Sequence, residues 1–198
     1  YSDDGETIYG GYGPRLFNMR GKYNQFESII KLLKSKPNTR QAVIQLFDVE
    51  DLLIKHKDIP CTCTLQFLLR GGKLNMITSM RSNDAYLGLP HDIFCFTMLQ
   101  EIVARSVGVE IGVYKHVVAS LHLYEKNHKD AILYLKEGVQ STKFPMPEMP
   151  IEDPGVSIEK ILKFENAVRN NYDISVESLK MDKYWLDLAY MLKILALS

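Results

Sequence analysis

Residues 61–80 read CTCTLQFLLRGGKLNMITSM, and the architecture of the chain can be worked out from them. Two runs, 61–70 and 74–80, mix apolar and polar residues in the alternating manner of half-buried β-strands. Gly71 and Gly72 stand between them and supply the positive φ angles that a tight turn needs. The segment therefore predicts an antiparallel β-hairpin.

The rest of the sequence predicts further strands and several helices. Apolar residues at helical spacing favour a helix at 23–35, and an almost continuous apolar run at 90–107 favours a helix buried on most sides. Mixed strands and helices with antiparallel hairpins are typical of the α+β class, here in a single domain of residues 1–198. The other expected elements are strands at 42–47 and 114–121 and helices at 127–136, 158–169 and 176–196.

Composition excludes several functional classes. Lysines and arginines total 24 and aspartates and glutamates total 24, so no net charge draws the chain to nucleic acid or to an anionic membrane. No apolar run reaches the roughly 20 residues of a membrane span. Three cysteines fit a reducing, cytoplasmic setting, and the isolated pair Cys61 and Cys63 is weak evidence for a metal, so none is expected.

Cys61 has two interpretations when its own surroundings are considered alone. A lone cysteine on a strand is more often a small buried hydrophobic residue than a nucleophile. Arg81 follows twenty residues later, and a guanidinium close to the thiol would lower its pKa and favour the thiolate. Spacing alone leaves both interpretations open.

Several separated motifs, in one order, resemble the thymidylate synthase superfamily, and the similarity extends from about residue 5 to 135 and fades after 155. The motifs are Ile8-Tyr9-Gly10, Asn38-Thr39-Arg40, Pro60-Cys61, Gln66-Phe67, Gly72-Lys73-Leu74, Arg81-Ser82-Asn83-Asp84, Leu87-Gly88-Leu89-Pro90, Asp92-Ile93, His122-Leu123-Tyr124 and Asn127-His128. The resemblance implies a mixed sheet flanked by helices with a long central buried helix. It also implies that the N-terminal part of the family fold is absent, and that 156–198 is a divergent helical C-terminus.

The resemblance implies one-carbon transfer to C5 of a pyrimidine nucleoside monophosphate. Cys61 would add to C6 of the base, and C5 would then attack the one-carbon unit of methylenetetrahydrofolate, the co-substrate. Loss of tetrahydrofolate would leave an exocyclic methylene group, which either hydride or water can quench. Tyr9 matches a tyrosine of the family's network of protons and water.

The binding residues are likewise assigned by resemblance. Arg81 and Ser82 match phosphate-binding positions, where a fork of charged donors suits a dianion. Arg40 matches an arginine that reaches the phosphate site of a partner subunit, which implies a homodimer. His122 and Tyr124 match the pair that holds the sugar 3′-hydroxyl, and on an edge strand both side chains would share one face.

Two aspartates complete the predicted site. Asp84 matches a residue that hydrogen-bonds the folate pterin, although an aspartate before Leu-Gly-Leu-Pro is also typical of a turn or helix cap. Asp92 stands where uridylate-methylating members carry asparagine. Its carboxyl group would accept from the cytosine amino group and, when protonated, donate to N3, which also assists thiol addition. The alternative is that Asp92 merely caps the helix after Pro90.

The chain departs from the family pattern at several positions. Gln41 replaces a second arginine, Thr62 replaces a histidine after the cysteine, and Ala119-Ser120 replaces the usual Gly-Asp. Family members with aspartate at position 92 resemble cytidylate and deoxycytidylate hydroxymethylases, so we predict a CMP or dCMP 5-hydroxymethyltransferase that finishes with water. The alternatives are a dTMP synthase acting on dUMP, or a nucleotide-binding homologue that has lost folate chemistry.

Overall fold

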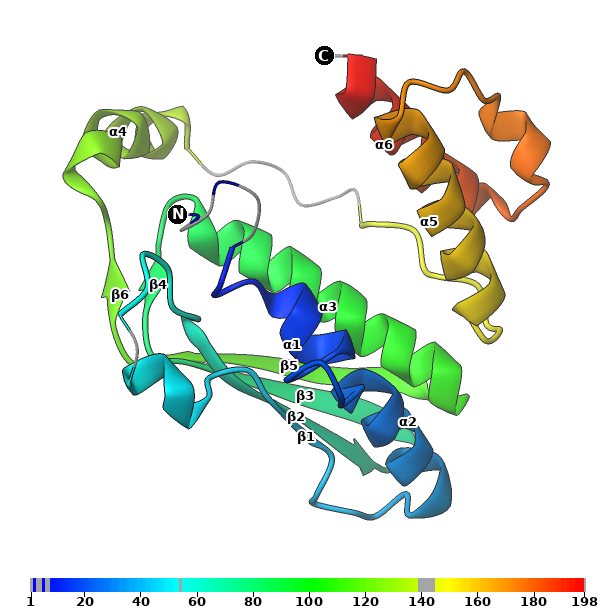
Figure 1. Cartoon of the computed structure of the whole chain (residues 1–198), viewed down its shortest axis with the longest axis horizontal. Helices are drawn as coiled ribbons and strands as arrows, with labels where there is room; N and C mark the ends of the chain where they lie inside the picture. Colours follow the sequence, from blue (N-terminus) through cyan, green and yellow to red (C-terminus); the bar gives the residue numbers. More distant parts are fainter. Residues whose placement is uncertain (1, 3–4, 6–7, 54, 139–144, 198) are drawn as a thin grey trace. The chain divides into compact units, whose positions relative to one another are not determined.

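The computed structural model describes residues 2, 5, 8–53, 55–138 and 145–197, and it divides the chain into two compact units, Tyr1–Gln140 and Ser141–Ser198 (Figure 1). The sequence predicts one domain with a distinct helical C-terminus from residue 156. The boundary between the units lies earlier, between Gln140 and Ser141, and the number of domains stays a prediction. Every predicted site residue lies in the first unit.

The described elements are of mixed type, which confirms the α+β class. The first unit contains α1 (Tyr12–Phe17), α2 (Gln25–Ser35), β1 (Val43–Gln45), the 3-10 helix η1 (Val49–Leu52), β2 (Thr62–Arg70), β3 (Lys73–Met80), β4 (Asn83–Asp84), α3 (Gly88–Val107), β5 (Glu110–Val118), β6 (Leu121–His122), η2 (Glu125–Asn127) and α4 (His128–Glu137). The second contains α5 (Gly155–Arg169), η3 (Val176–Leu179) and α6 (Lys183–Leu197).

The main sheet is mixed, as the resemblance implies. Its strand order is β1-β2-β3-β5, with β1–β2 and β2–β3 antiparallel and β3–β5 parallel. Helices α1, α2 and α3 all lie over one face of this sheet (Figure 1). A separate parallel pair, β4–β6, follows the end of β3 and carries several predicted site residues.

The predicted hairpin is present as β2 and β3. Gly71 and Gly72 have φ angles of 56° and 75°, the left-handed values that a tight turn requires and that glycine adopts without strain. Arg70 pairs with Lys73 on either side of them. At the other end the register slips between Thr62 and Thr64, which marks a β-bulge at the start of β2.

The core of the first unit lies between the sheet and its covering helices. Leu65, Phe67, Leu74 and Met76 point inward from β2 and β3 and are fully buried. The opposite face of the sheet is open in this chain. Its β1 and β5 residues Val43, Val113 and Val117 are 40%, 59% and 52% exposed.

Helix α3 differs in part from the prediction of a helix buried on most sides. Its buried residues start at Phe96, whereas Ile93 and Phe94 in its N-terminal half are exposed. The physical reason is that α3 packs on the sheet through only one of its faces. The opposite face of the helix does not contact the core, although it carries apolar residues. The helix remains long and packs on β3 and β5.

The C-terminal region also differs from its prediction. One helix is expected at 176–196, but the structure has η3, a break and then α6. Lys180 adopts a left-handed φ of 48°, which ends the 3-10 turn, and the Asp182 side chain then accepts from Tyr184 N–H at the start of α6. Phe164, Val176 and Ala189 form the core of this second unit. Among the described residues, none of the helices combines the length and apolarity that crossing a membrane requires.

Candidate active site

The hairpin brings Cys61 next to Arg81. Arg81 N–H donates to the Cys61 carbonyl across 2.9 Å, which extends the β2–β3 ladder by one residue beyond the bulge. The Arg81 side chain folds back along the same segment, because its Nε and Nη2 donate to the carbonyls of Pro60 and Ile59 at 3.0 Å each. A cationic group is thereby held beside the candidate nucleophile.

The Cys61 thiol lies in a half-buried position, and burial raises its pKa. The charge of Arg81 acts in the opposite direction and lowers the pKa. Asp58 and Asp92 raise it further, because a thiolate beside a carboxylate is repelled. In the nucleotide-free chain Cys61 is therefore a thiol at neutral pH, and its thiolate fraction increases as the pH rises.

Tyr12 supplies a hydroxyl group at the same place. Its Oη receives hydrogen bonds from the Thr62 backbone N–H at 3.2 Å and from the Thr62 hydroxyl at 2.9 Å. Burial raises the Tyr12 pKa, and the nearby Asp92 and Cys61 raise it further. Tyr12 is therefore a protonated phenol that neighbours both candidate chemical groups, a position the sequence analysis did not assign to it.

Tyr9, the tyrosine assigned by resemblance, has different surroundings. Its ring stacks on His56 with a centroid separation of 3.4 Å, and the Arg15 guanidinium lies 5.0 Å from the ring centroid. Arg15 also forms a buried ion pair with Asp51 at 2.8 Å. Burial raises the Tyr9 pKa, and its hydrogen bond to Asp51 adds to that effect. The contacts described for Tyr9 therefore belong to this ion-pair cluster, and its proton-network role stays a prediction.

The sequence contained a signal for Tyr12. The pair Tyr-Gly occurs twice within five residues, as Tyr9-Gly10 and Tyr12-Gly13, and the family resemblance includes only the first copy. Local sequence does not distinguish the two copies; in the structure Tyr12 is the first residue of α1, whereas Tyr9 precedes the helix.

Three of the predicted sugar and phosphate ligands come together. Ser82 Oγ lies 3.2 Å from His122 Nδ1, and the His122 ring meets the Tyr124 ring edge to face at 4.8 Å between centroids. The pairing of β4 with β6 aligns Asp84 with His122 and so brings segments about 40 residues apart into contact. Tyr124 lies just beyond β6, so the two rings meet without sharing one strand.

Asp84 is held by the backbone that starts α3. Its carboxylate accepts from the N–H groups of Tyr86 at 3.1 Å, Leu87 at 3.1 Å and Gly88 at 3.4 Å. Burial acts to raise its pKa, but these hydrogen bonds outweigh burial and lower it. Asp84 therefore has the local capping role that the sequence allows, and its proposed contact with a pterin stays a prediction.

Asp92 lies in the first turns of α3, half-buried, and burial raises its pKa. A hydrogen bond from Asn83 and the charge of His91 act in the opposite direction. The charge of Asp92 also raises the pKa values of Cys61, Tyr12 and Tyr114, so these groups lie within electrostatic range of its carboxyl group.

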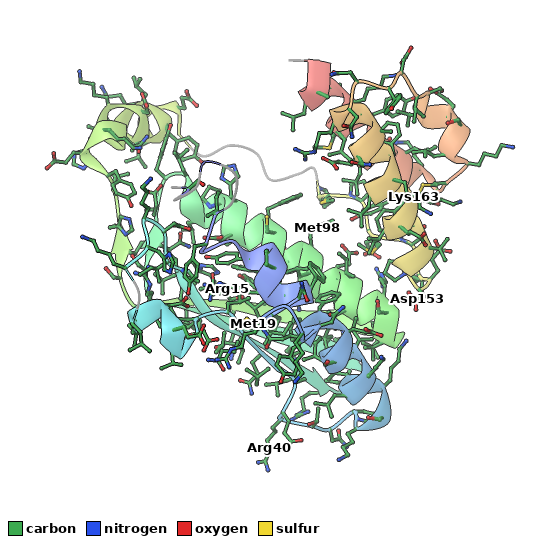
Figure 2. The ribbon with its side chains drawn as sticks, viewed as in Figure 1. Arg15, Met19, Arg40, Met98, Asp153 and Lys163 are labelled. Carbon is green, nitrogen blue, oxygen red and sulfur yellow. The ribbon has the colours of Figure 1, made fainter. Side chains whose placement is uncertain are left out.

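Arg40 stands apart from the group around Cys61. It is exposed in the segment between α2 and β1, and its carbonyl accepts from the Gln66 side chain at 3.3 Å. Figure 2 shows its side chain projecting outward from the edge of the first unit. The role of Arg40 in a partner subunit's phosphate site stays a prediction.

A sequence model described as Thymidylate synthase matches residues 2–184. The chain belongs to the thymidylate synthase family. The recognition made from Cys61, Arg81 and the His122–Tyr124 motif is therefore confirmed at family level.

Individual relatives carry two different names. A Listeria monocytogenes protein named thymidylate synthase is 28% identical over 180 residues, which cover 90% of this chain and 51% of the relative. A Pseudomonas phage M6 protein named deoxyuridylate hydroxymethyltransferase is 40% identical over 131 residues, covering 64% of this chain and 36% of the relative. A second protein of that name, from Bacillus phage SP01, is 30% identical over 201 residues, covering 92% and 52%. The chain spans about half or less of the length of these relatives.

This thymidylate synthase family member has an apolar pocket beside the Asp84 turn. The pocket has a volume of about 670 Å³ and lies between the start of α3 and α4. Leu87, Pro90 and Ile93 line one side, and Tyr134 and Leu135 line the other. Such a lining suits a flat aromatic group better than an ion. Within the described residues, no group of three or more His, Cys, Asp or Glu side chains is arranged to hold a metal ion.

The position of Arg81 predicts how the alkylation rate of the Cys61 thiol depends on pH. Arg81→Gln removes the charge that lowers the Cys61 pKa, so alkylation of Cys61 by iodoacetamide at pH 8 should slow severalfold, and its pH profile should move upward. Peptide mass spectrometry distinguishes Cys61 from Cys63 and Cys95. Arg70→Gln, at the far end of β2, is the matched control and should leave the profile unchanged. Equal profiles for the wild type and Arg81→Gln would contradict this electrostatic role.

Proposed function

We propose that this chain carries the reactive centre of a pyrimidine nucleotide C5 hydroxymethyltransferase that acts on CMP or dCMP. The observation that supports the proposal is the shared site of Cys61 and Asp92, with Arg81 bound alongside. A nucleophile, a group that can pair with a base edge and a cation that can meet a phosphate are the three elements that this chemistry requires.

The proposed reaction begins with the Cys61 thiolate, which forms a bond to C6 of the base and makes C5 nucleophilic. C5 then forms a bond to the one-carbon unit of methylenetetrahydrofolate. Loss of the C5 proton and departure of tetrahydrofolate leave an exocyclic methylene group. Tyr12, a protonated phenol beside both Cys61 and Asp92, is suited to pass protons to water or to the base. Addition of water to the methylene carbon and loss of the thiolate from C6 restore the aromatic ring and complete the hydroxymethyl group.

Asp92 supports cytosine as the base. A neutral carboxyl group accepts a hydrogen bond from the 4-amino group through one oxygen and donates to N3 through the other. Burial raises the Asp92 pKa, which favours this neutral form when the nucleotide excludes water. Donation to N3 also withdraws electron density from the ring and so assists addition of Cys61 at C6.

Other groups are proposed as binding residues. Ser82, His122 and Tyr124 form a contiguous set that suits phosphate and sugar hydroxyl groups. The apolar pocket next to Asp84 suits the aromatic part of the folate. All three cysteines are free thiols, which supports a reducing, cytoplasmic setting.

The second candidate is hydroxymethylation or methylation of dUMP. The two phage relatives are named deoxyuridylate hydroxymethyltransferases, and the Listeria relative is named thymidylate synthase. The phage names support water as the final nucleophile, but they also favour uracil as the base. The predicted cytosine preference therefore depends on Asp92 alone.

We further propose a homodimer formed through the open face of the sheet. Val43, Val113 and Val117 place apolar surface on that face, and the outward-pointing Arg40 lies at its β1 edge. A twofold interface of this kind would bring Arg40 of each subunit to the other subunit's phosphate site.

One assay tests the reaction class. The protein is incubated with methylenetetrahydrofolate and, separately, CMP, dCMP, UMP or dUMP, and the products are identified by mass. We expect a hydroxymethyl adduct of a cytosine nucleotide, and we expect Cys61→Ala to bind nucleotide but form no product, because the bond to C6 is lost. Cys63→Ala is the matched control and should retain activity. A methyl adduct, or product from uracil nucleotides only, would contradict the proposal.

Base selection is tested at Asp92. Asp92→Asn places an amide where the carboxyl group was, and an amide can donate to O4 and accept from N3–H of uracil. We expect the ratio of kcat/KM for cytosine over uracil nucleotides to fall by about tenfold or more, since mispairing a buried polar edge costs about 1–3 kcal/mol. An unchanged ratio would remove Asp92 from base recognition.

Subunit complementation tests Arg40. Arg40→Ala and Cys61→Ala should each be nearly inactive alone, whereas mixed subunits that exchange freely should recover about a quarter of wild-type activity, because one complete site forms in each mixed dimer. Arg81→Ala mixed with Cys61→Ala is the control and should recover none, since both changes fall in the same subunit's site. Recovery in both mixtures, or in neither, would contradict a role for Arg40 in the partner's site.

A further inference from the structure

The parallel pair β3–β5 contains a second bulge, which turns two polar side chains of β5 inward. Leu74 pairs with Ile111 and Met76 pairs with Tyr114, so β5 carries one extra residue between these two pairs. Successive side chains of a strand point to opposite faces, and one extra residue therefore reverses the face of every side chain that follows it. Tyr114 and His116 are half-buried as a result, and Tyr114 packs against the hydrophobic core.

Two amide side chains hold this bulge. Asn75 Oδ1 accepts from the Val113 N–H at 2.8 Å, and Gln100 Nε2, on α3, donates to the Leu74 carbonyl at 2.8 Å. A Cβ placed on Gly112 would lie 2.5 Å from Asn75 Oδ1, so a side chain at that position would displace the Asn75 amide. Backbone groups that the bulge frees from the ladder thus find partners, and the inward direction of the side chains beyond it is fixed.

His116 connects β5 to the short strand β4. Its Nε2 lies 3.1 Å from Asn83 Nδ2, and its Nδ1 lies 2.6 Å from the Tyr114 hydroxyl. Asn83 Nδ2 also donates to Met80 Sδ at 3.3 Å. Asn83 and Met80 are 3% and 2% exposed, so the amide is bound in the interior between the end of β3 and the side chain from β5.

The two fixed neighbours determine the proton positions in this group. A thioether sulfur accepts and cannot donate, so the amide atom that faces Met80 is the nitrogen. An amide nitrogen only donates, so His116 Nε2 accepts and the proton of the neutral ring lies on Nδ1, directed at Tyr114. Burial lowers the His116 pKa, which favours this neutral ring. The hydrogen bond between strands therefore runs from Asn83 to His116.

Asn83 stands between two residues of the candidate site. Ser82 and Asp84 are half-buried and Asn83 is buried, so the three side chains alternate between the two faces of the segment. Strand β4 has only two residues, which pair with Leu121 and His122, and a ladder this short fixes a segment weakly. The interior hydrogen bonds of Asn83 supply a further attachment, on the face opposite Ser82.

We propose that Asn83 and His116 are positioning residues whose hydrogen bond anchors β4 and so holds Ser82 in place for the nucleotide phosphate. The inference rests on the proposed assignment of Ser82 to the phosphate and is independent of which base is bound. The anchor acts from the buried side of β4, while Ser82 Oγ, 3.2 Å from His122 Nδ1, faces the candidate site.

The first test determines the tautomer of His116 in the nucleotide-free full chain. Nitrogen-15 NMR of the imidazole rings, with the His116 signals assigned by their loss in His116→Gln, should show a protonated Nδ1 and an unprotonated Nε2 at pH 7. Asn83→Leu removes the donor to Nε2, so the Nε2–H form should gain population. His128→Phe, which changes an exposed histidine on α4, should leave the His116 signals unchanged. A protonated Nε2 in the wild type would overturn the proposal.

The second test isolates the contribution of the phosphate to binding. The ratio of the dissociation constants of cytidine and CMP should fall by about tenfold in Asn83→Leu and in His116→Phe, as expected for loss of one hydrogen bond to a charged group. His116→Gln can present an amide oxygen to Asn83 and should retain more of the ratio than His116→Phe. Circular dichroism confirms that each variant is folded. Equal weakening of cytidine and CMP in the folded variants would overturn the positioning role.

A double-mutant cycle tests whether the anchor acts through Ser82. Ser82→Ala alone should lower the same ratio, and adding His116→Phe to it should lower the ratio no further, because the hydroxyl that the anchor positions is already absent. A second fall as large as the one that His116→Phe causes in the wild type would overturn the proposal.

The outcomes separate this inference from the proposed function. The ratio is measured without turnover and is repeated with uridine and UMP, so it reports on the anchor whichever base the protein prefers. Absence of any hydroxymethylated product would overturn the proposed reaction and leave these measurements intact. Normal product together with an unchanged ratio in the folded Asn83→Leu and His116→Phe variants would overturn the anchor alone.

Discussion

The register of the β2–β3 hairpin determines where the reactive groups of this protein lie. The two glycines set the pairing at one end, and the bulge near Cys63 shifts it at the other, so that Cys61 meets Arg81. Without the bulge, the regular pairing of the hairpin would set Cys61 opposite Ser82 instead. A shift of one residue reverses the face to which a strand side chain points. Bulges are frequent beside active sites for this reason.

Partial burial of the candidate site shifts the pKa values of its acidic groups in the same direction. Burial raises the pKa values of Cys61, Tyr12 and Asp92, and Arg81 is the cation that opposes it at the thiol. All three groups therefore hold their protons more firmly than they would in water. Cys61 therefore remains protonated when no nucleotide is bound. This is consistent with the proposed mechanism, in which Cys61 becomes a reactive thiolate only when the substrate is in place.

The proposed homodimer would use two features of the first unit that have no role within one copy of the chain. Arg40 points away from the group around Cys61, and the outer face of the sheet exposes apolar residues. Both features acquire a function if a second copy supplies the missing surface. The chain spans about half of the length of these relatives.

Much of this protein could be read from the residues alone. Gly71-Gly72 between two alternating runs predicted the hairpin, and the motifs around Cys61, Arg81 and His122 identified the family, because turn chemistry and ordered motifs are local properties of a sequence. The choice of Tyr12 over Tyr9 as neighbour of Cys61, and the connection of Asn83 to His116, came only from the folded chain. They depend on side-chain contacts between residues 33 and 50 positions apart, and such contacts are set by tertiary packing and not by neighbours in the sequence.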